Sequence, residues 1–177
     1  MTGQVRPGSI ESVHGMPSPV GHSLGGVAAA WPLVPRRTRR GALVLAAVAV
    51  APDLDLLVGA HRDASHSVGA ALMAGLVACL FARRHRLAWG GAITLAYLSH
   101  VLLDWLSNDT RPPIGVMALW PFSHGYFKAA IEIFPPVSRR YWESRFWIYN
   151  LHAVLVEILV LAPITLSVLW WWRRRVA

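Results

Sequence analysis

Cysteine is nearly absent from this 177-residue chain, which has a single one at position 79. A lone cysteine excludes an internal disulfide and any zinc site built from cysteine ligands. Cys79 lies in an apolar run, so we interpret it as a small core residue of a helix. The first 21 residues lack the apolar segment of a secretory signal peptide, so we expect membrane insertion to depend on internal helices.

Acidic residues are also scarce. Nine Asp and Glu stand against 17 Lys and Arg, which gives a net charge of +8 at pH 7 and a pI near 11.0. The arginines form short clusters between apolar runs, at 36–40, 83–86 and 173–175. Such clusters are typical of the cytoplasmic flanks of membrane helices. We therefore expect no nucleic-acid partner, and DNA binding is an alternative suggested by the pI alone.

Apolar sequence is abundant. Hydrophobic residues make up 55% of the chain and the mean hydropathy is +0.43, which is too apolar for an ordinary soluble domain of this length. We predict an all-α fold, an integral membrane bundle of about four to five apolar helices; a soluble, deeply buried bundle is the alternative. Residues 1–18 are expected to form a flexible tail and residues 19–177 a single helical membrane domain.

The apolar runs also predict where the helices lie. We expect helices at 22–34, 42–56, 66–82, 87–106 and 147–172, with Ser65 as the N-cap of the third helix and a long connection over 107–146. The positive-inside rule places the arginine clusters in the cytoplasm, the N-terminus outside and the C-terminus inside. The chain is then a multi-pass protein of the inner (cytoplasmic) membrane. In this orientation the chain's candidate metal ligands all fall toward the outer side.

The strongest local signal is the stretch Ser99-His-Val-Leu-Leu-Asp104. A histidine and an aspartate four residues apart share one face of a helix, about 6 Å apart along its axis, so both can reach one metal ion. In an apolar helix such a pair is costly unless it is paired or liganded. We predict a site for a divalent metal, with zinc expected first and manganese or iron as options. Its predicted ligands are His22, Asp55, His61, His66, His100, Asp104 and Glu157.

Each of these residues also has a simpler interpretation. The pair in 99–104 would be a buried hydrogen bond, and the acids at 53 and 55 would be exposed residues at a helix end. The histidines at 61 and 66 would be ordinary loop residues, His22 would cap its helix, and Glu157 would pair with an arginine. Their occurrence on one predicted side of the membrane favours the metal site.

Five motifs in this order resemble those of the membrane-bound metal-dependent hydrolases of the LexA-regulated inner-membrane protein type. They are His22-Ser-Leu-Gly-Gly, Pro52-Asp-Leu-Asp55, His61-Arg-Asp-Ala-Ser-His66-Ser, Ser99-His-Val-Leu-Leu-Asp104 and Leu119-Trp-Pro-Phe-Ser123. A more distant resemblance connects His22, Asp55, His66, His100 and Asp104 with the metal sites of zinc-dependent phospholipase C and S1-type nucleases. The later His-x-x-x-Glu and the N-terminal tryptophan ligand of those enzymes have no match, which predicts one or two metals rather than three.

The resemblance and the residues together imply a membrane-embedded metal-dependent hydrolase. It would act on a phosphoester such as a lipid or lipid-linked substrate at the outer membrane interface, with membrane lipid as its partner. Asp53 or Asp63 would act as general base or support a ligand, and Arg62 would steady the substrate phosphate. The alternative is a non-catalytic membrane protein with a structural metal site.

Overall fold

The computed structural model describes residues 16–35, 37–58, 62–109 and 112–175. The part of the chain described contains no β-strand, only the isolated bridges Ser107–Phe134 and Val116–Phe127. The predicted all-α fold class is confirmed. In chain order the helices are α1 (Pro19–Ala30), η2 (Trp31–Leu33), α2 (Arg39–Val50), η3 (Ala51–Val58), η4 (Ala64–His66), α3 (Val68–Phe81), α4 (Arg86–Trp105) and α5 (Phe146–Arg174).

Three of the α-helices begin at a hydroxyl side chain, as capping preferences lead us to expect. The hydroxyls of Ser18, Thr38 and Ser67 each accept a hydrogen bond from a backbone N–H three residues on, at the starts of α1, α2 and α3. The prediction of Ser65 as N-cap is therefore wrong by two residues. Ser65 lies inside η4, and its hydroxyl serves the site described below.

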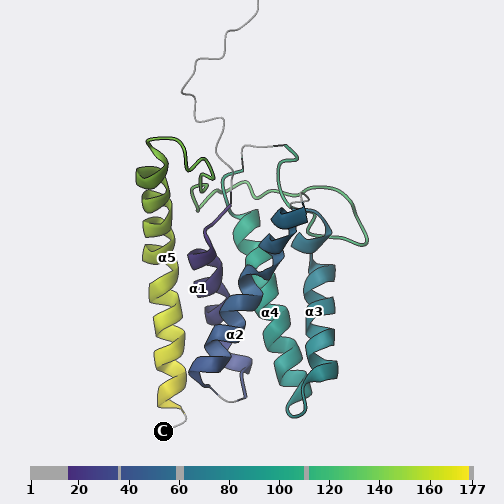
Figure 1. Cartoon of the computed structure of the whole chain (residues 1–177). Coiled ribbons are helices and arrows are strands. Elements are labelled where there is room, and N and C mark those ends of the chain that lie inside the picture. The colour runs from purple at the N-terminus through teal and green to yellow at the C-terminus, as the bar shows by residue number, and fades with distance from the viewer. Residues whose placement is uncertain (1–15, 36, 59–61, 110–111, 176–177) are drawn as a thin grey trace, which may run out of the picture.

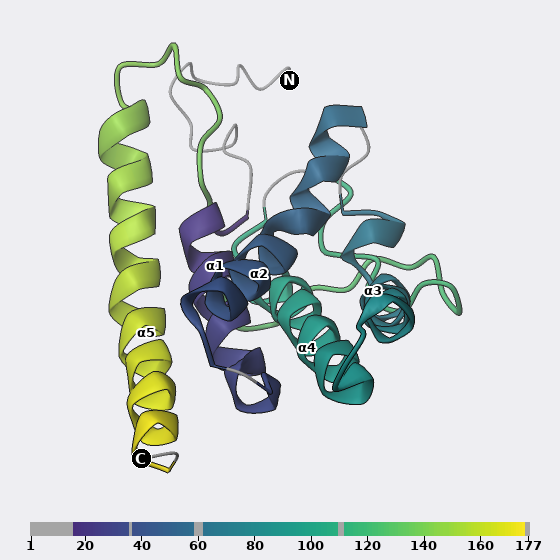
Figure 2. The same cartoon turned by 60° about the horizontal axis from the view of Figure 1, so that its bottom comes forward.

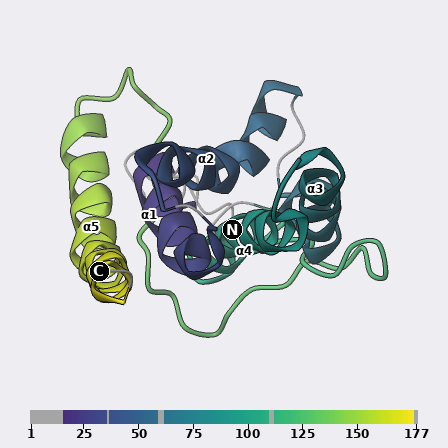
Figure 3. The same cartoon turned by 90° about the horizontal axis from the view of Figure 1, so that it is seen from below.

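The helices form one bundle in which α1 and α4 are central. α1 packs against α2, α4 and α5, while α4 also packs against α2 and α3. Figure 1 shows α5 along one side of the bundle and α3 along the other. The rotated views agree: α1 lies between α5 and α4 (Figure 2), and α2 lies next to α1 in the view from below (Figure 3).

The two ends of the bundle differ in character. The α1–α2 and α3–α4 connections and the end of α5 all lie at the lower end in Figure 1, so the described arginines of the three clusters gather there. We call this the basic end. Arg37 and Arg174 lie over the rings of Trp172 and Trp170, at 4.4 and 3.8 Å from the ring centroids. The start of α1, η3, η4 and the end of α4 lie at the opposite end.

Two helices are long and apolar enough to cross a membrane, α4 and α5, and α3 is a shorter apolar helix. α5 buries the smaller share of its length, and large apolar side chains such as Leu159 and Leu166 face outward from it. An outward apolar surface of this kind suits contact with lipid.

The N-terminal tail differs from the expectation where it is described. Most of residues 1–18 lie outside the described residues, but Met16, Pro17 and Ser18 are buried. The backbone carbonyl of Met16 accepts a hydrogen bond from Val137 N at 3.1 Å, which joins this segment to the long 107–145 connection. The chain is therefore packed from residue 16 onward.

Close packing of α1 on α2 depends on Gly26. A Cβ at this position would lie far inside van der Waals contact with Ala49 Cβ and 3.1 Å from the carbonyl oxygen of Leu45. Neither group can rotate away. At Gly91 in α4, by contrast, a Cβ would meet only the end of the Leu33 side chain, at 3.1 Å. Small residues at such crossings let helix backbones approach closely.

We therefore expect Gly26→Ala to destabilise the protein and Gly91→Ala to be neutral or stabilising. Both changes gain up to about 1 kcal/mol of helix propensity, but only Gly26→Ala adds an overpacking cost of about 1–3 kcal/mol. Thermal unfolding of the two variants in the same detergent measures the difference. Equal melting temperatures would contradict this account of the α1–α2 contact.

Candidate metal centre

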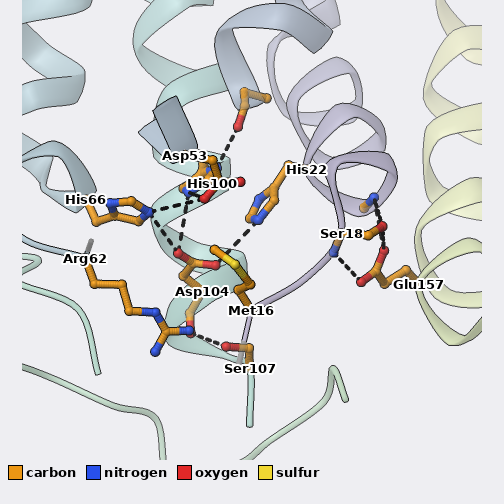
Figure 4. Close-up of polar contacts among 12 residues, drawn as sticks. Met16, Ser18, His22, Asp53, Arg62, His66, His100, Asp104, Ser107 and Glu157 are labelled. Atoms are coloured by element: carbon orange, nitrogen blue, oxygen red, sulfur yellow. Dashed lines mark hydrogen bonds and ion pairs between the residues drawn. The ribbon is translucent and has the colours of Figure 1, made fainter. Parts of the chain in front are cut away.

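Five ionisable side chains from four separate elements meet near the end of the bundle opposite the basic end. α1 supplies His22, η3 supplies Asp53, η4 supplies His66, and α4 supplies His100 and Asp104 (Figure 4). We call these five residues the metal cluster. The four-residue spacing in α4 places its two members on one face, as predicted.

The distances within the metal cluster are short. His66 Nε2 and His100 Nε2 lie 3.3 and 3.4 Å from one oxygen of Asp104, and His22 Nε2 lies 3.5 Å from the other. Asp53 Oδ1 is 3.7 Å from both His66 Nε2 and His100 Nε2. The His22 and His100 rings are stacked, with centroids 3.8 Å apart. Two sets of possible ligands therefore share His100: one with His22 and Asp104, the other with Asp53 and His66.

The metal cluster is almost completely buried. The side chains of His22, His66, His100 and Asp104 have no exposed area, and that of Asp53 is 12% exposed. Nε2 of His22 and of His100, Oδ1 of Asp53 and both oxygens of Asp104 have no hydrogen-bond partner within the described ranges. Buried polar atoms are ordinarily paired, and each exception needs an explanation. A cation bound among these lone pairs would satisfy all of them at once.

Hydrogen bonds from outside the cluster fix two of its imidazole rings. His100 Nδ1 lies 2.7 Å from the backbone carbonyl of Ala49. A carbonyl only accepts, so the proton is on Nδ1 and the Nε2 lone pair points into the cluster. His66 Nδ1 lies 3.2 Å from Asp55 Oδ2, and Ser65 Oγ donates to the same oxygen at 2.6 Å. Such carboxylate–histidine pairs orient metal ligands.

This arrangement exchanges the predicted roles of two aspartates. Asp55 was predicted to be a ligand and Asp53 a base or supporting residue, but Asp53 faces the cluster and Asp55 supports His66 from behind. The reason lies in η3, where a tighter helix carries the two side chains in different directions. The hydroxyl of Ser65 was missed as part of the site. The position of Ser65 directly before His66 in the sequence could have indicated this role.

The other predicted site residues that the structure describes lie outside the metal cluster. His61 lies outside the described residues. Glu157 is buried in α5 but away from the cluster, and accepts hydrogen bonds from Ser18 N at 2.6 Å and Gly21 N at 3.1 Å (Figure 4). Asp63 accepts from the Tyr126 hydroxyl, and Arg62 pairs with Asp109. The prediction of Glu157 as a ligand is therefore not supported by its position, because Glu157 fastens α5 to the start of α1.

An apolar pocket with a volume of about 600 Å³ does not belong to this centre. It borders Leu98, Leu102 and Trp105 of α4. Leu98 and Leu102 point away from His100, because positions two apart on a helix point about 200° from one another. The ionisable groups that could support chemistry therefore lie at the cluster and not in this apolar pocket.

Comparison with protein families identifies the chain. The model of the YdjM inner membrane protein family matches residues 16–176, nearly the whole sequence. The chain belongs to this family. Membership agrees with the apolar helices and supports a location in the inner membrane. No match was found among curated proteins or among solved structures.

The donor set of the metal cluster fits a divalent ion of the zinc, manganese or iron type. Neutral imidazole and carboxylate are the ligands that these ions take in proteins. Without an ion the cluster holds protons. Burial alone would lower the pKa of His66, but the nearby carboxylates of Asp53, Asp55 and Asp104 raise this pKa to about 9.

Metal uptake should therefore become stronger as the pH rises toward 9. Below its pKa His66 carries a proton that an incoming ion must displace, so the affinity should fall by up to about tenfold for each pH unit below 9. Titration of the metal-free protein with zinc at pH 7.0, 7.5 and 8.0 measures this dependence. An affinity that stays constant over this range would contradict a proton held on His66.

Proposed function

We propose that this protein is a membrane-embedded metal-dependent hydrolase that acts on a phosphoester, such as a lipid or a lipid-linked molecule. The observation that carries the proposal is the group of buried lone pairs in the metal cluster, which lack hydrogen-bond partners in the described chain and face one another. Leaving such atoms unsatisfied costs about 1–3 kcal/mol each, more if they are charged. A bound cation would compensate this cost, because the lone pairs of these atoms would coordinate it.

One or two ions would be held. His22, His100 and Asp104 form one ligand set, and Asp53 and His66 with His100 form the other. A divalent ion in such a site lowers the pKa of water to near 7 and stabilises the charge that develops on phosphoryl oxygens. Asp55 and the Ala49 carbonyl would keep His66 and His100 in the orientation for binding.

Asp53 would mark the reactive side of the cluster. Its side chain is the one member with exposed area, 12%, so solvent or substrate would reach the centre past it. A carboxylate at this position is suited to accept a proton from an attacking water. Asp63 is a weaker candidate for the base because its carboxylate is engaged by Tyr126.

A structural metal site is the second candidate function. The complete burial of His22, His66, His100 and Asp104 favours it, because structural sites have no coordination position open to water. The partial exposure of Asp53 favours the hydrolase. Hydrolysis of a generic phosphodiester by the purified metal-loaded protein separates the two.

We expect Asp104→Asn to abolish most metal binding and phosphodiester hydrolysis together. Loss of a direct ligand should cost more than the roughly 10–100-fold in affinity that follows loss of an outer-shell partner. Glu157→Gln is the matched control, because it neutralises another fully buried acid of a long helix that lies outside the cluster. Metal content per folded protein, measured after purification in detergent, is the primary readout. Normal metal content and turnover in Asp104→Asn would refute the proposed site.

We also propose that the centre faces the outer side of the inner membrane, because the arginines gather at the opposite end of the bundle. With Cys79 replaced by alanine, we expect a cysteine at Arg39 to be labelled only from the cytoplasm and a cysteine at Phe122 only from outside. Phe122 is 96% exposed in the connection at the site end. Labelling of both positions from one side would contradict this orientation.

A further inference from the structure

Two arginines of the site end, Arg62 and Arg139, form no ion pair with any residue of the metal cluster within the described chain. Arg62 follows η3, and Arg139 lies in the 107–145 connection, so they come from distant parts of the chain. Neither belongs to the basic end. Both are at least partly buried, and burial of a guanidinium needs a reason because the charge loses its hydration.

Arg62 is held rigidly and still has a donor to offer. Its side chain is only 6% exposed and pairs with Asp109. The Asp109 carboxylate also accepts a hydrogen bond from Gly115 N at 2.7 Å. Its backbone is in the left-handed region, with φ at 66°. Within the described segments, Nη2 of Arg62 is buried and has no hydrogen-bond partner. One arm of the guanidinium is therefore fixed and the other remains available.

The backbone around Arg139 is also fixed. The Asn150 side chain brackets Ser138, accepting from Ser138 N at 2.7 Å and donating to Ser138 O at 2.8 Å. Val137 N donates to the carbonyl of Met16. These bonds attach the residues just before Arg139 to α5 and to the segment before α1. The position of Arg139 is thus determined by its neighbours and not by an ion pair of its own.

The guanidinium of Arg139 has a poor partner. Its Nη2 lies 2.5 Å from the thioether sulfur of Met16, and no carboxylate of the described chain forms an ion pair with it. A thioether is a weak acceptor for a charged donor. Its neighbour Arg140, in contrast, forms an ion pair with Glu143 at 2.9 Å. Arg139 is therefore a partly buried cation at the site end for which the described chain supplies no matching anion.

Arg139 also lies within electrostatic reach of the metal cluster. Burial lowers the pKa of Arg139, and the carboxylates of Asp53, Asp55 and Asp104 oppose this change, with Asp53 exerting the strongest attraction. Asp53 is also the cluster residue with exposed area. Met16, which contacts Arg139, is drawn in Figure 4 between Asp104 and Ser18. Arg139 is thus connected to the neighbourhood of Asp104 through its contact with Met16.

We propose that Arg139, assisted by the available arm of Arg62, binds the phosphoryl group of the substrate beside the metal cluster. This inference rests on the proposed function and specifies the anion that the centre takes. Once an ion neutralises the carboxylates of Asp53 and Asp104, these two no longer balance the charge of Arg139. A guanidinium donates two parallel hydrogen bonds to phosphoryl oxygens. A tetrahedral phosphoryl group has enough oxygens to contact a metal ion and both arginines, whereas a carboxylate has only two.

The test is the affinity of the zinc-loaded, full-length protein for inorganic phosphate, measured by calorimetry in detergent. We expect Arg139→Gln to weaken phosphate binding by at least about tenfold, and Arg139→Lys to weaken it less, because lysine keeps the charge but loses the paired donors. Arg140→Gln is the matched control. It removes the same charge one residue away, from a side chain that is 39% exposed, and should bind phosphate like the unaltered protein.

Metal content, measured on the same samples, separates this inference from the proposed function. Full zinc content with equal phosphate affinity in Arg139→Gln and Arg140→Gln would overturn the anion site and leave the metal centre standing. Phosphate binding that depends on Arg139 in a protein that takes up no zinc would refute the hydrolase and support the anion site.

Competition experiments identify the source of the phosphoryl group. Phosphatidic acid in mixed micelles and soluble glycerol 3-phosphate carry the same headgroup chemistry. If the lipid displaces inorganic phosphate at a much lower concentration, a membrane lipid is the source. Equal potency would indicate a water-soluble phosphate, and failure of both to compete would contradict a phosphoryl site.

Discussion

The structure depends on the burial of three histidines and two aspartates at one point between helices. In an apolar bundle the desolvation of such groups costs several kcal/mol for each charge, so they must be compensated by one another, by protons or by a cation. In the metal-free centre a proton on His66 balances part of the carboxylate charge, as the raised pKa of His66 indicates. This requirement brings η3, η4, the start of α1 and the end of α4 together, because each contributes at least one side chain.

Five acidic side chains of the described chain make different contacts. Asp104 and Asp53 face the cluster, Asp55 orients His66, Glu157 joins α5 to the start of α1, and Asp109 holds Arg62. A Cβ at Gly21 would lie 2.7 Å from the Glu157 carboxylate, so the glycine allows this junction. The two helices most suited to cross a membrane, α4 and α5, thus differ in role: α4 carries ligands and α5 supports the fold.

Much of this arrangement could be predicted from the sequence. Hydrophobic runs and arginine clusters predicted the all-helical fold, and the His100–Asp104 spacing placed two residues of the centre on one face of a helix. Local spacing did not distinguish Asp53 from Asp55, because the direction of each side chain depends on the 3-10 geometry of η3. Glu157 was predicted to be a metal ligand, because an acid in an apolar helix looks the same in sequence whether it binds an ion or accepts a hydrogen bond from Ser18. Arg139 had no local signal, because its surroundings come from Met16 and Asn150, distant in sequence.

X-ray absorption spectroscopy of the zinc-loaded, detergent-purified protein tests the central claim most directly, because it reports which atoms surround the metal. The account predicts nitrogen and oxygen ligands at about 2.0–2.1 Å, with the outer-shell scattering that imidazole rings produce from two or three histidines. A first shell of oxygen alone, without imidazole scattering, would contradict a metal bound by His22, His66 and His100. The account would also be contradicted if no zinc remained bound to the folded protein after purification.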